Sequence, residues 1–283
     1  MPAPAAVPMG QTVDVARLRV PPSTLSDRLR DAGCVAADEE AAELLAEAPD
    51  DATLESWISR RQQGEPLAWI TGRSEFCGHD LRIGPGVFVP RVQSEELARR
   101  AAVALAASGG RAADLCTGCG PIAFHLMTQV PGATVVGVDI DMRAVASARH
   151  NGIPAVVGDL DGPLLARSFD VVTAIAPYVP TGALRLLPLD VQRYEPRLSL
   201  DGGEDGLDIV RRIIAAASRL LVPGGWVFLE LGGEQDEAVM SILGAAGFGR
   251  VSTWCDDDGD LRGLAAEASG TVGQRPSNRP GPS

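Results

Sequence analysis

Three aspartates occupy positions where carboxylates could bind a nucleoside. Asp114 leads the segment Asp-Leu-Cys-Thr-Gly-Cys-Gly at 114–120, and glycines in such a turn let the backbone approach a ligand closely. Asp139 ends the apolar run Val-Val-Gly-Val-Asp, where a carboxylate can accept hydrogen bonds from both ribose hydroxyls. Asp159 follows a third apolar run, in a place suited to an adenine amino group. Together the three positions predict a nucleotide-binding half-sheet.

The acid that leads the loop indicates which cofactor is bound. A dinucleotide-binding loop reads Gly-x-Gly-x-x-Gly and seats a pyrophosphate at a helix N-terminus. A carboxylate at Asp114 would repel pyrophosphate but can hold the cationic methionine end of S-adenosylmethionine. We therefore predict S-adenosylmethionine as cofactor and S-adenosylhomocysteine as product. The alternative is that Asp114 only caps a turn made by the glycines, and the matching places of Asp139 and Asp159 argue against it.

The elements that must position these residues alternate between helix and strand from residue 94 onward, which predicts a doubly wound, mainly parallel α/β sheet with right-handed crossovers. A final hairpin at 251–255 and 264–268 is expected to turn at 256–259. The predicted strands before it are 112–115, 134–138, 155–157, 171–175 and 225–231. The predicted helices are 94–107, 122–130, 142–150, 206–221 and 234–246.

The first 90 residues have a different pattern. Three short amphipathic helices are expected, from Ser23 or Ser26 to residue 32, at 39–48 and at 52–61. A strand at 76–83, a turn at 84–86 and a strand at 87–90 would form a hairpin linker. The predicted organisation is a flexible arm (1–20), a helical domain (21–75), the linker (76–90), a methyltransferase domain (91–269) and a disordered tail (270–283).

Composition excludes several other classes of protein. The formal net charge of −12 disfavours binding to nucleic acid, which needs cations to neutralise phosphates. The five cysteines include a Cys-x-x-Cys pair, but no second pair supplies the further ligands of a zinc site, so no metal is predicted. No apolar run approaches the ~18 residues of a membrane span. Because the N-terminus also lacks a signal-peptide pattern, we interpret the protein as cytoplasmic and free of membrane partners.

Beyond the cofactor loop, a series of segments matches one known family in order along the chain: residues 60–72, 75–76, 86–91, 114–120, 137–140, 178–180, 195–196, 202–207 and 223–225. On these segments the chain resembles the HemK/PrmC family of protein-glutamine N5-methyltransferases. The resemblance implies a helical N-terminal domain, a hairpin linker and a class I (Rossmann-like) methyltransferase domain. The predicted cofactor-binding residues are Arg91, Asp114, Cys116, Thr117, Gly118, Gly120, Asp139, Ile140, Gly158, Asp159, Leu160 and Ile175.

The chain departs from the family at the motif that holds the methyl acceptor. The family has Asn-Pro-Pro-Tyr, where the Asn side chain and the next backbone carbonyl accept hydrogen bonds from the target NH2. This chain has Ile-Ala-Pro-Tyr at 175–178, and isoleucine has no hydrogen-bond acceptor. The predicted catalytic residues are Ile175, Ala176, Pro177, Tyr178, Tyr194 and Glu195. His79 and His125 are further candidate bases, although His125 could simply pack in its helix.

Three functions remain open from the sequence. Ile175 beside Tyr178 suits a small aromatic acceptor, such as an indole methylated at carbon in secondary metabolism, as in indole C3-methyltransferases of the PsmD type. The alternative is a protein-glutamine methyltransferase acting on a release factor or another protein. A catalytically silent cofactor-binding protein is the third, which the intact cofactor loop disfavours. The sequence leaves the oligomeric state open, and a homo-oligomer is possible.

Overall fold

The computed structural model describes residues 22–233 and 235–269, which form two compact units. The first contains the residues up to Arg73 together with Pro188–Tyr194, and the second contains Ser74–Leu187 and the residues from Glu195 onward. The predicted arm at 1–20 and tail at 270–283 lie outside the described residues. No helix in the described part of the chain is long and apolar enough to cross a membrane.

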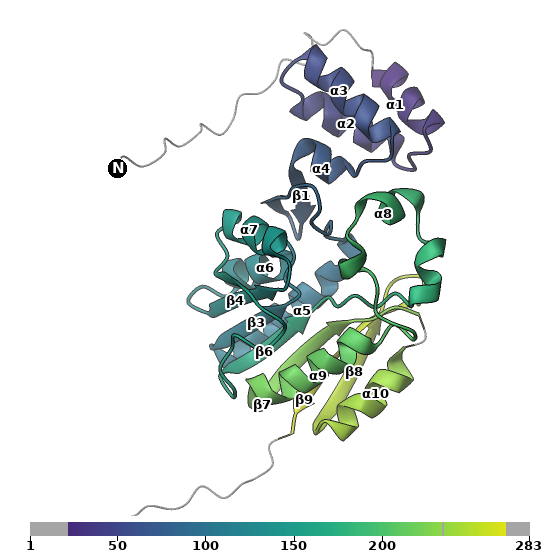
Figure 1. Cartoon of the computed structure of the whole chain (residues 1–283). Coiled ribbons are helices and arrows are strands. Elements are labelled where there is room, and N and C mark those ends of the chain that lie inside the picture. The colour runs from purple at the N-terminus through teal and green to yellow at the C-terminus, as the bar shows by residue number, and fades with distance from the viewer. Residues whose placement is uncertain (1–21, 234, 270–283) are drawn as a thin grey trace, which may run out of the picture. The chain divides into compact units, whose positions relative to one another are not determined.

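The first unit is a small bundle of helices (Figure 1). The three predicted helices are confirmed, and their apolar faces bury leucines and isoleucines such as Leu29, Leu44 and Ile58. Two short helices were not predicted, and one of them comes from the separate segment at 188–194. The helices of this unit are α1 (Pro22–Asp31), α2 (Ala37–Glu47), α3 (Asp51–Gln62), α4 (Leu67–Thr71) and α8 (Leu189–Tyr194).

A hairpin of β1 (Arg73–Phe76) and β2 (His79–Arg82) follows the helices along the chain. Its two-residue turn is Cys77 and Gly78, with φ of 51° and 72°, and positive φ at both central residues matches the twist of the strands. The prediction of a strand at 87–90 is wrong, because residues 83–91 contain no strand. The Gly-Pro-Gly segment at 84–86 was predicted as the hairpin turn. The structure has the turn at Cys77 and Gly78, inside the segment predicted as the first strand.

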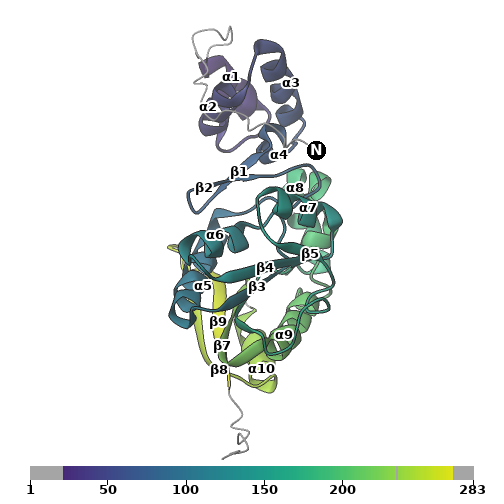
Figure 2. The same cartoon turned by 90° about the vertical axis from the view of Figure 1, so that its left-hand side faces the viewer.

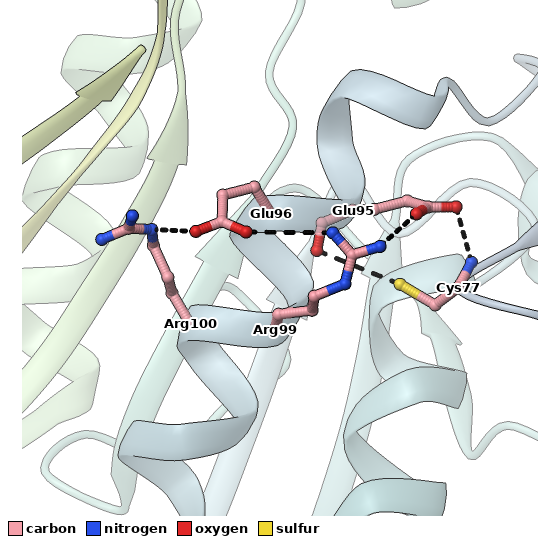
Figure 3. A network of polar contacts seen from close by, with 5 residues as sticks. All are labelled: Cys77, Glu95, Glu96, Arg99 and Arg100. Carbon is pink, nitrogen blue, oxygen red and sulfur yellow. Dashed lines mark hydrogen bonds and ion pairs between the residues drawn. The ribbon is translucent and has the colours of Figure 1, made fainter. Parts of the chain in front are cut away.

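The hairpin turn is bonded to the start of α5 (Glu95–Ser108), as Figure 3 shows. The Cys77 amide donates to Oε1 of Glu95 at 2.8 Å, and the Cys77 thiol lies 3.9 Å from the Glu95 carbonyl oxygen. Arg99 pairs with the other oxygen of Glu95, and the Arg100 guanidinium donates to Glu96 at 2.7 Å. The Glu95 carboxylate therefore holds Cys77 in a backbone conformation that non-glycine residues seldom adopt.

The second unit is built on one sheet with the order β5-β4-β3-β6-β7-β9-β8, in which the five strands from β5 to β7 are parallel and β9 is antiparallel to both of its neighbours. This confirms the doubly wound α/β fold. The strands are β3 (Arg111–Leu115), β4 (Thr134–Asp139), β5 (Ala155–Val157), β6 (Phe169–Ala174), β7 (Leu221–Glu230), β8 (Phe248–Cys255) and β9 (Leu261–Ala268). The predicted final hairpin is β8 and β9.

Helices cover both faces of this sheet, with α9 and α10 on one side and α5 and α6 on the other (Figures 1 and 2). Each face buries an apolar cluster, one containing Val172 and Ile214 and the other containing Leu97 and Leu126. The remaining helices are α6 (Pro121–Gln129), α7 (Met142–His150), α9 (Asp208–Leu220) and α10 (Asp236–Ala245), with 3-10 turns η2 (Val92–Ser94), η3 (Thr181–Leu186) and η4 (Arg197–Ser199). The carboxyl ends of the parallel strands meet at one edge, where ligands bind in such sheets.

Candidate active site

The cofactor loop connects the carboxyl end of β3 to α6 and is organised around Asp114. This carboxylate is buried and accepts hydrogen bonds from the hydroxyls of Thr117 at 2.6 Å and Thr173 at 2.7 Å. Burial raises the pKa of Asp114 to about 6, although both hydroxyls act to lower it. Asp114 therefore orders the loop, and direct contact with the methionine end of the cofactor stays a prediction.

The glycines of this loop leave room for a ligand. Gly118 and Gly120 have φ of 59° and 89°, and a Cβ at Gly118 would meet no atom within 4 Å. A Cβ at Gly120 would lie 2.0 Å from the Ile153 side chain, so this glycine is needed for packing. Cys116, at φ 57°, also has left-handed backbone. The open space at Gly118 fits a cofactor that lies against the backbone.

Asp139 ends β4 beside this loop. Its Oδ2 accepts from the Gly118 amide and its Oδ1 accepts from the Asp141 amide, both at 2.9 Å. These two bonds fix the orientation of the carboxylate, and each oxygen keeps a second lone pair for a ribose hydroxyl. Burial raises the pKa of Asp139. The donor set and the space at Gly118 thus fit the ribose of S-adenosylmethionine.

Four further residues predicted to bind the cofactor follow β4 and β5, and one of them, Asp159, is expected to bind the adenine amino group. Ile140 is about half exposed, and the Gly158 amide donates to the Asp139 carbonyl at 2.9 Å. The Asp159 carboxylate forms an ion pair at 2.7 Å with Arg212 on α9, a partner that was not predicted. Leu160 is buried with φ of 48°. If adenine donates a hydrogen bond to Asp159, adenine and Arg212 would therefore both bind the same carboxylate.

The Cys-x-x-Cys pair has no feature of a metal or redox centre. Both thiols are free, and burial raises the pKa of Cys119 to about 12 and that of Cys116 still further. Thiols with such pKa values are neither good ligands nor good nucleophiles. Among residues 22–233 and 235–269, no group of three or more His, Cys, Asp or Glu side chains could hold a metal ion.

The acceptor motif at 175–178 follows β6, directly beside the cofactor loop, because β3 and β6 are neighbouring strands with Leu115 opposite Ala174. Ile175 packs against the core cluster on the α5 side of the sheet, and Ala176 is buried. The Tyr178 hydroxyl donates to Oε1 of Glu230 at 3.2 Å. Burial and the Glu230 carboxylate raise the pKa of Tyr178, so this phenol is not a general base near neutral pH.

The two remaining candidate catalytic residues lie in different units. Tyr194 belongs to the first unit, where its hydroxyl donates to the Gln63 carbonyl at 3.1 Å and its ring meets Trp69 edge-on. Glu195 belongs to the second unit, where it is buried and forms an ion pair with Arg91. The structure thus brings together the predicted residues Arg91 and Glu195.

The two histidines considered as bases pack on α6. His79 Nε2 lies 3.2 Å from the Thr128 hydroxyl, and its ring contacts Phe124 and His125. His125 is buried, and burial lowers its pKa. These contacts support packing roles for both.

Glu230 is the main site residue that the sequence did not reveal. It ends β7, the strand beside β6, and it is only 4 % exposed. An acid ending the apolar run Trp-Val-Phe-Leu-Glu was a usable signal, because Asp139 ends its strand in the same way.

The affinity for S-adenosylhomocysteine should depend on pH through Asp114. The cationic amino group of the ligand would favour the ionised carboxylate, so binding should tighten by about 10-fold from pH 5 to pH 7 and then level off. Titration calorimetry at several pH values measures this. In Asp114→Asn the affinity should depend less on pH, and the remaining dependence should come from Asp139. Glu96→Gln, which removes a half-buried acid on α5 that pairs with Arg100, should keep the pH dependence of the wild type. If the affinity of Asp114→Asn depended on pH as strongly as that of the wild type, this would contradict a contact between Asp114 and the ligand.

Comparison with known proteins agrees with this fold. The model of the methyltransferase small domain matches residues 80–172. The chain is 39 % identical over 208 residues to a release factor glutamine methyltransferase of Geobacter sulfurreducens, covering 71 % of this chain and 73 % of the relative. It is 37 % identical over 203 residues to a 4-amino-L-phenylalanine/4-methylamino-L-phenylalanine methyltransferase of Streptomyces pristinaespiralis, covering 68 % and 69 %.

Among solved structures, the hMettl16 catalytic domain in complex with MAT2A 3′UTR hairpin 6 has a TM-score of 0.53 at 16 % identity, covering 80 % of this chain and 84 % of that one, which indicates a shared fold only. The fold, the cofactor loop and the acidic strand ends define a class I S-adenosylmethionine-dependent methyltransferase. Within that class, the chain belongs to the HemK/PrmC family of release factor glutamine methyltransferases.

Proposed function

We propose that the chain transfers a methyl group to the side-chain amide nitrogen of a glutamine in a protein. The observation that carries this proposal is the acceptor motif at the carboxyl end of β6, where Ala176, Pro177 and Tyr178 follow the strand next to the cofactor loop. Relatives named release factor glutamine methyltransferases, which are 33–40 % identical to the chain, support the same acceptor.

Ala176, Tyr178 and Ile175 would each contact a planar amide in a different way. When bound, S-adenosylmethionine supplies a methyl group on a positively charged sulfur. The backbone carbonyl of Ala176 can accept one N–H of the amide whatever the side chain at that position. The Tyr178 ring packs against the flat amide, which aligns the nitrogen lone pair with the methyl group. Ile175 contributes only apolar contact, so the second N–H loses a partner that the family's asparagine provides.

A small aromatic acceptor is the second candidate function, and Ile175 favours it. An apolar side chain beside Tyr178 suits a flat ring that is oriented by packing. The relative from Streptomyces pristinaespiralis is named for an amino-substituted phenylalanine, which is an aromatic acceptor of this kind. An indole methylated at carbon would fit the same apolar surroundings, because its reacting atom carries no N–H that needs an acceptor.

Labelled cofactor separates the two candidates. The full chain is incubated with methyl-labelled S-adenosylmethionine and either a Gly-Gly-Gln peptide, 4-amino-L-phenylalanine or an indole. We expect label on the glutamine peptide and none on a matched Gly-Gly-Asn peptide. Labelling of an aromatic acceptor alone would reject the glutamine proposal in favour of the second candidate. Failure to bind S-adenosylhomocysteine in calorimetry would reject both and revive the silent cofactor-binding protein.

A further inference from the structure

A buried carboxylate is bonded to the tyrosine of the acceptor motif. Glu230 ends β7, and β6 pairs with β7 in parallel with Ala174 opposite Leu229. Ile175 and Glu230, the next residue of each chain segment, therefore lie at the same edge of the sheet, at the carboxyl ends of two neighbouring strands. Burial raises the pKa of Glu230, while the hydroxyls of Ser94 and Tyr178 and the positive charges of Arg262 and Arg91 lower it. Its Oε1 accepts a hydrogen bond from the Tyr178 hydroxyl at 3.2 Å.

The residues after Glu230 hold two other parts of the same tyrosine. A Cβ at Gly232 would lie 2.9 Å from Cε2 of the Tyr178 ring, so the ring packs directly on the glycine backbone. The Gln235 side chain donates from Nε2 to the Tyr178 carbonyl at 3.1 Å, and its Oε1 lies 3.4 Å from the Gly232 amide. The hydroxyl, ring and carbonyl of Tyr178 are thus held by Glu230, Gly232 and Gln235.

We propose that Glu230, Gly232 and Gln235 form a clasp that positions the Tyr178 ring against the methyl acceptor, and that they are positioning residues of methyl transfer. This inference rests on the proposed function, since it concerns the acceptor side of the same site. The clasp engages the hydroxyl, the ring and the carbonyl of Tyr178. Tyr178 acts here as a flat surface, with its hydroxyl used as an anchor.

The absence of an acceptor at Ile175 makes this clasp more important than it would be beside an asparagine. With one hydrogen bond fewer on the substrate nitrogen, packing against Tyr178 supplies more of the orientation. Misplacement of a reacting group by about 1 Å can cost 100-fold in rate. Without the clasp, the Tyr178 ring can still bind the acceptor, but a smaller fraction of the bound acceptor is oriented for methyl transfer. The turnover number should therefore fall more than the Michaelis constant rises.

Steady-state kinetics on the acceptor that the wild type methylates tests the clasp. Glu230→Ala and Gln235→Ala should each lower kcat by about 10- to 100-fold, with KM and the affinity for S-adenosylhomocysteine changed less than about 3-fold. Glu230→Gln keeps an acceptor for the Tyr178 hydroxyl and should recover most of the activity. In a Tyr178→Phe background, Glu230→Ala should have little further effect, because the two residues share one interaction. Equal losses in kcat and cofactor affinity, or additive effects of the pair, would overturn the proposal.

A second measurement does not depend on the acceptor. The chain has two tyrosines, Tyr178 and Tyr194, so tyrosine labelled with 13C at Cζ gives two NMR signals that Tyr194→Phe assigns. The pKa of Tyr178 should lie above its ordinary value and fall in Glu230→Gln, which removes the neighbouring charge. An unchanged pKa overturns the clasp even if glutamine is methylated. A lowered pKa in a protein that does not label glutamine supports the clasp and rejects the proposed acceptor.

Discussion

Replacing Asp139 with alanine is expected to weaken the binding of S-adenosylhomocysteine by about 100-fold or more. Each hydrogen bond to a charged group contributes about 1.5–3 kcal/mol, and two ribose hydroxyls would lose their acceptor at once. Since about 1.4 kcal/mol is tenfold in affinity, the loss of both exceeds 100-fold. The variant also frees the Gly118 amide, which Asp139 holds at 2.9 Å. Titration calorimetry on the full chain measures the change.

Asp141 offers a matched control for this experiment. It lies two residues further along, carries the same charge and caps α7 by accepting from the Arg143 amide at 2.8 Å. Asp141→Ala should cost about 1 kcal/mol of stability through the lost cap, while ligand affinity should change by less than about 3-fold. If both variants lost affinity equally, the effect of Asp139→Ala would reflect damage to the end of β4 and not a lost ribose contact.

The sheet and its cofactor edge could be predicted because local patterns determine them. The helix at 142–150 and the strand at 155–157 were predicted with their observed bounds, since an apolar face and Asp141 as cap mark the helix, and a short apolar run marks the strand. β7 begins four residues earlier than predicted, at Leu221, because a bulge accommodates Pro223 and the glycines after it. Asp114 and Asp139 follow directly from such patterns.

The features that were missed depend on contacts between distant parts of the chain. The hairpin turn uses Cys77 at positive φ, and the Glu95 carboxylate that holds it lies 18 residues away. Tyr178 and Glu230 are 52 residues apart and meet only because β6 pairs with β7. Arg212 reaches Asp159 across 53 residues. No local periodicity encodes such pairs, so the sequence indicated where the strands end but not which side chains meet there.

Replacing Ile175 with asparagine is expected to raise kcat/KM for glutamine methylation by about 10- to 100-fold. The new side-chain oxygen would accept the N–H that Ile175 leaves without a partner, and satisfying a buried donor is worth about 1–3 kcal/mol. Activity on an aromatic acceptor should fall in the same variant, because a polar group then faces the ring. Both rates are measured with labelled cofactor on a Gly-Gly-Gln peptide and on 4-amino-L-phenylalanine.

Ile175→Leu separates the hydrogen bond from the change of shape. Leucine has nearly the branching of asparagine but no polar atom, so the difference between the two variants is the contribution of the new acceptor. Because Ile175 packs against the core on the α5 side of the sheet, both variants should lose stability, and the affinity for S-adenosylhomocysteine shows whether the cofactor site survives. A rise in aromatic methylation in Ile175→Asn would contradict an apolar acceptor site. If glutamine methylation rose equally in Ile175→Leu, the gain would come from shape, and the missing acceptor would not be what limits methylation of an amide.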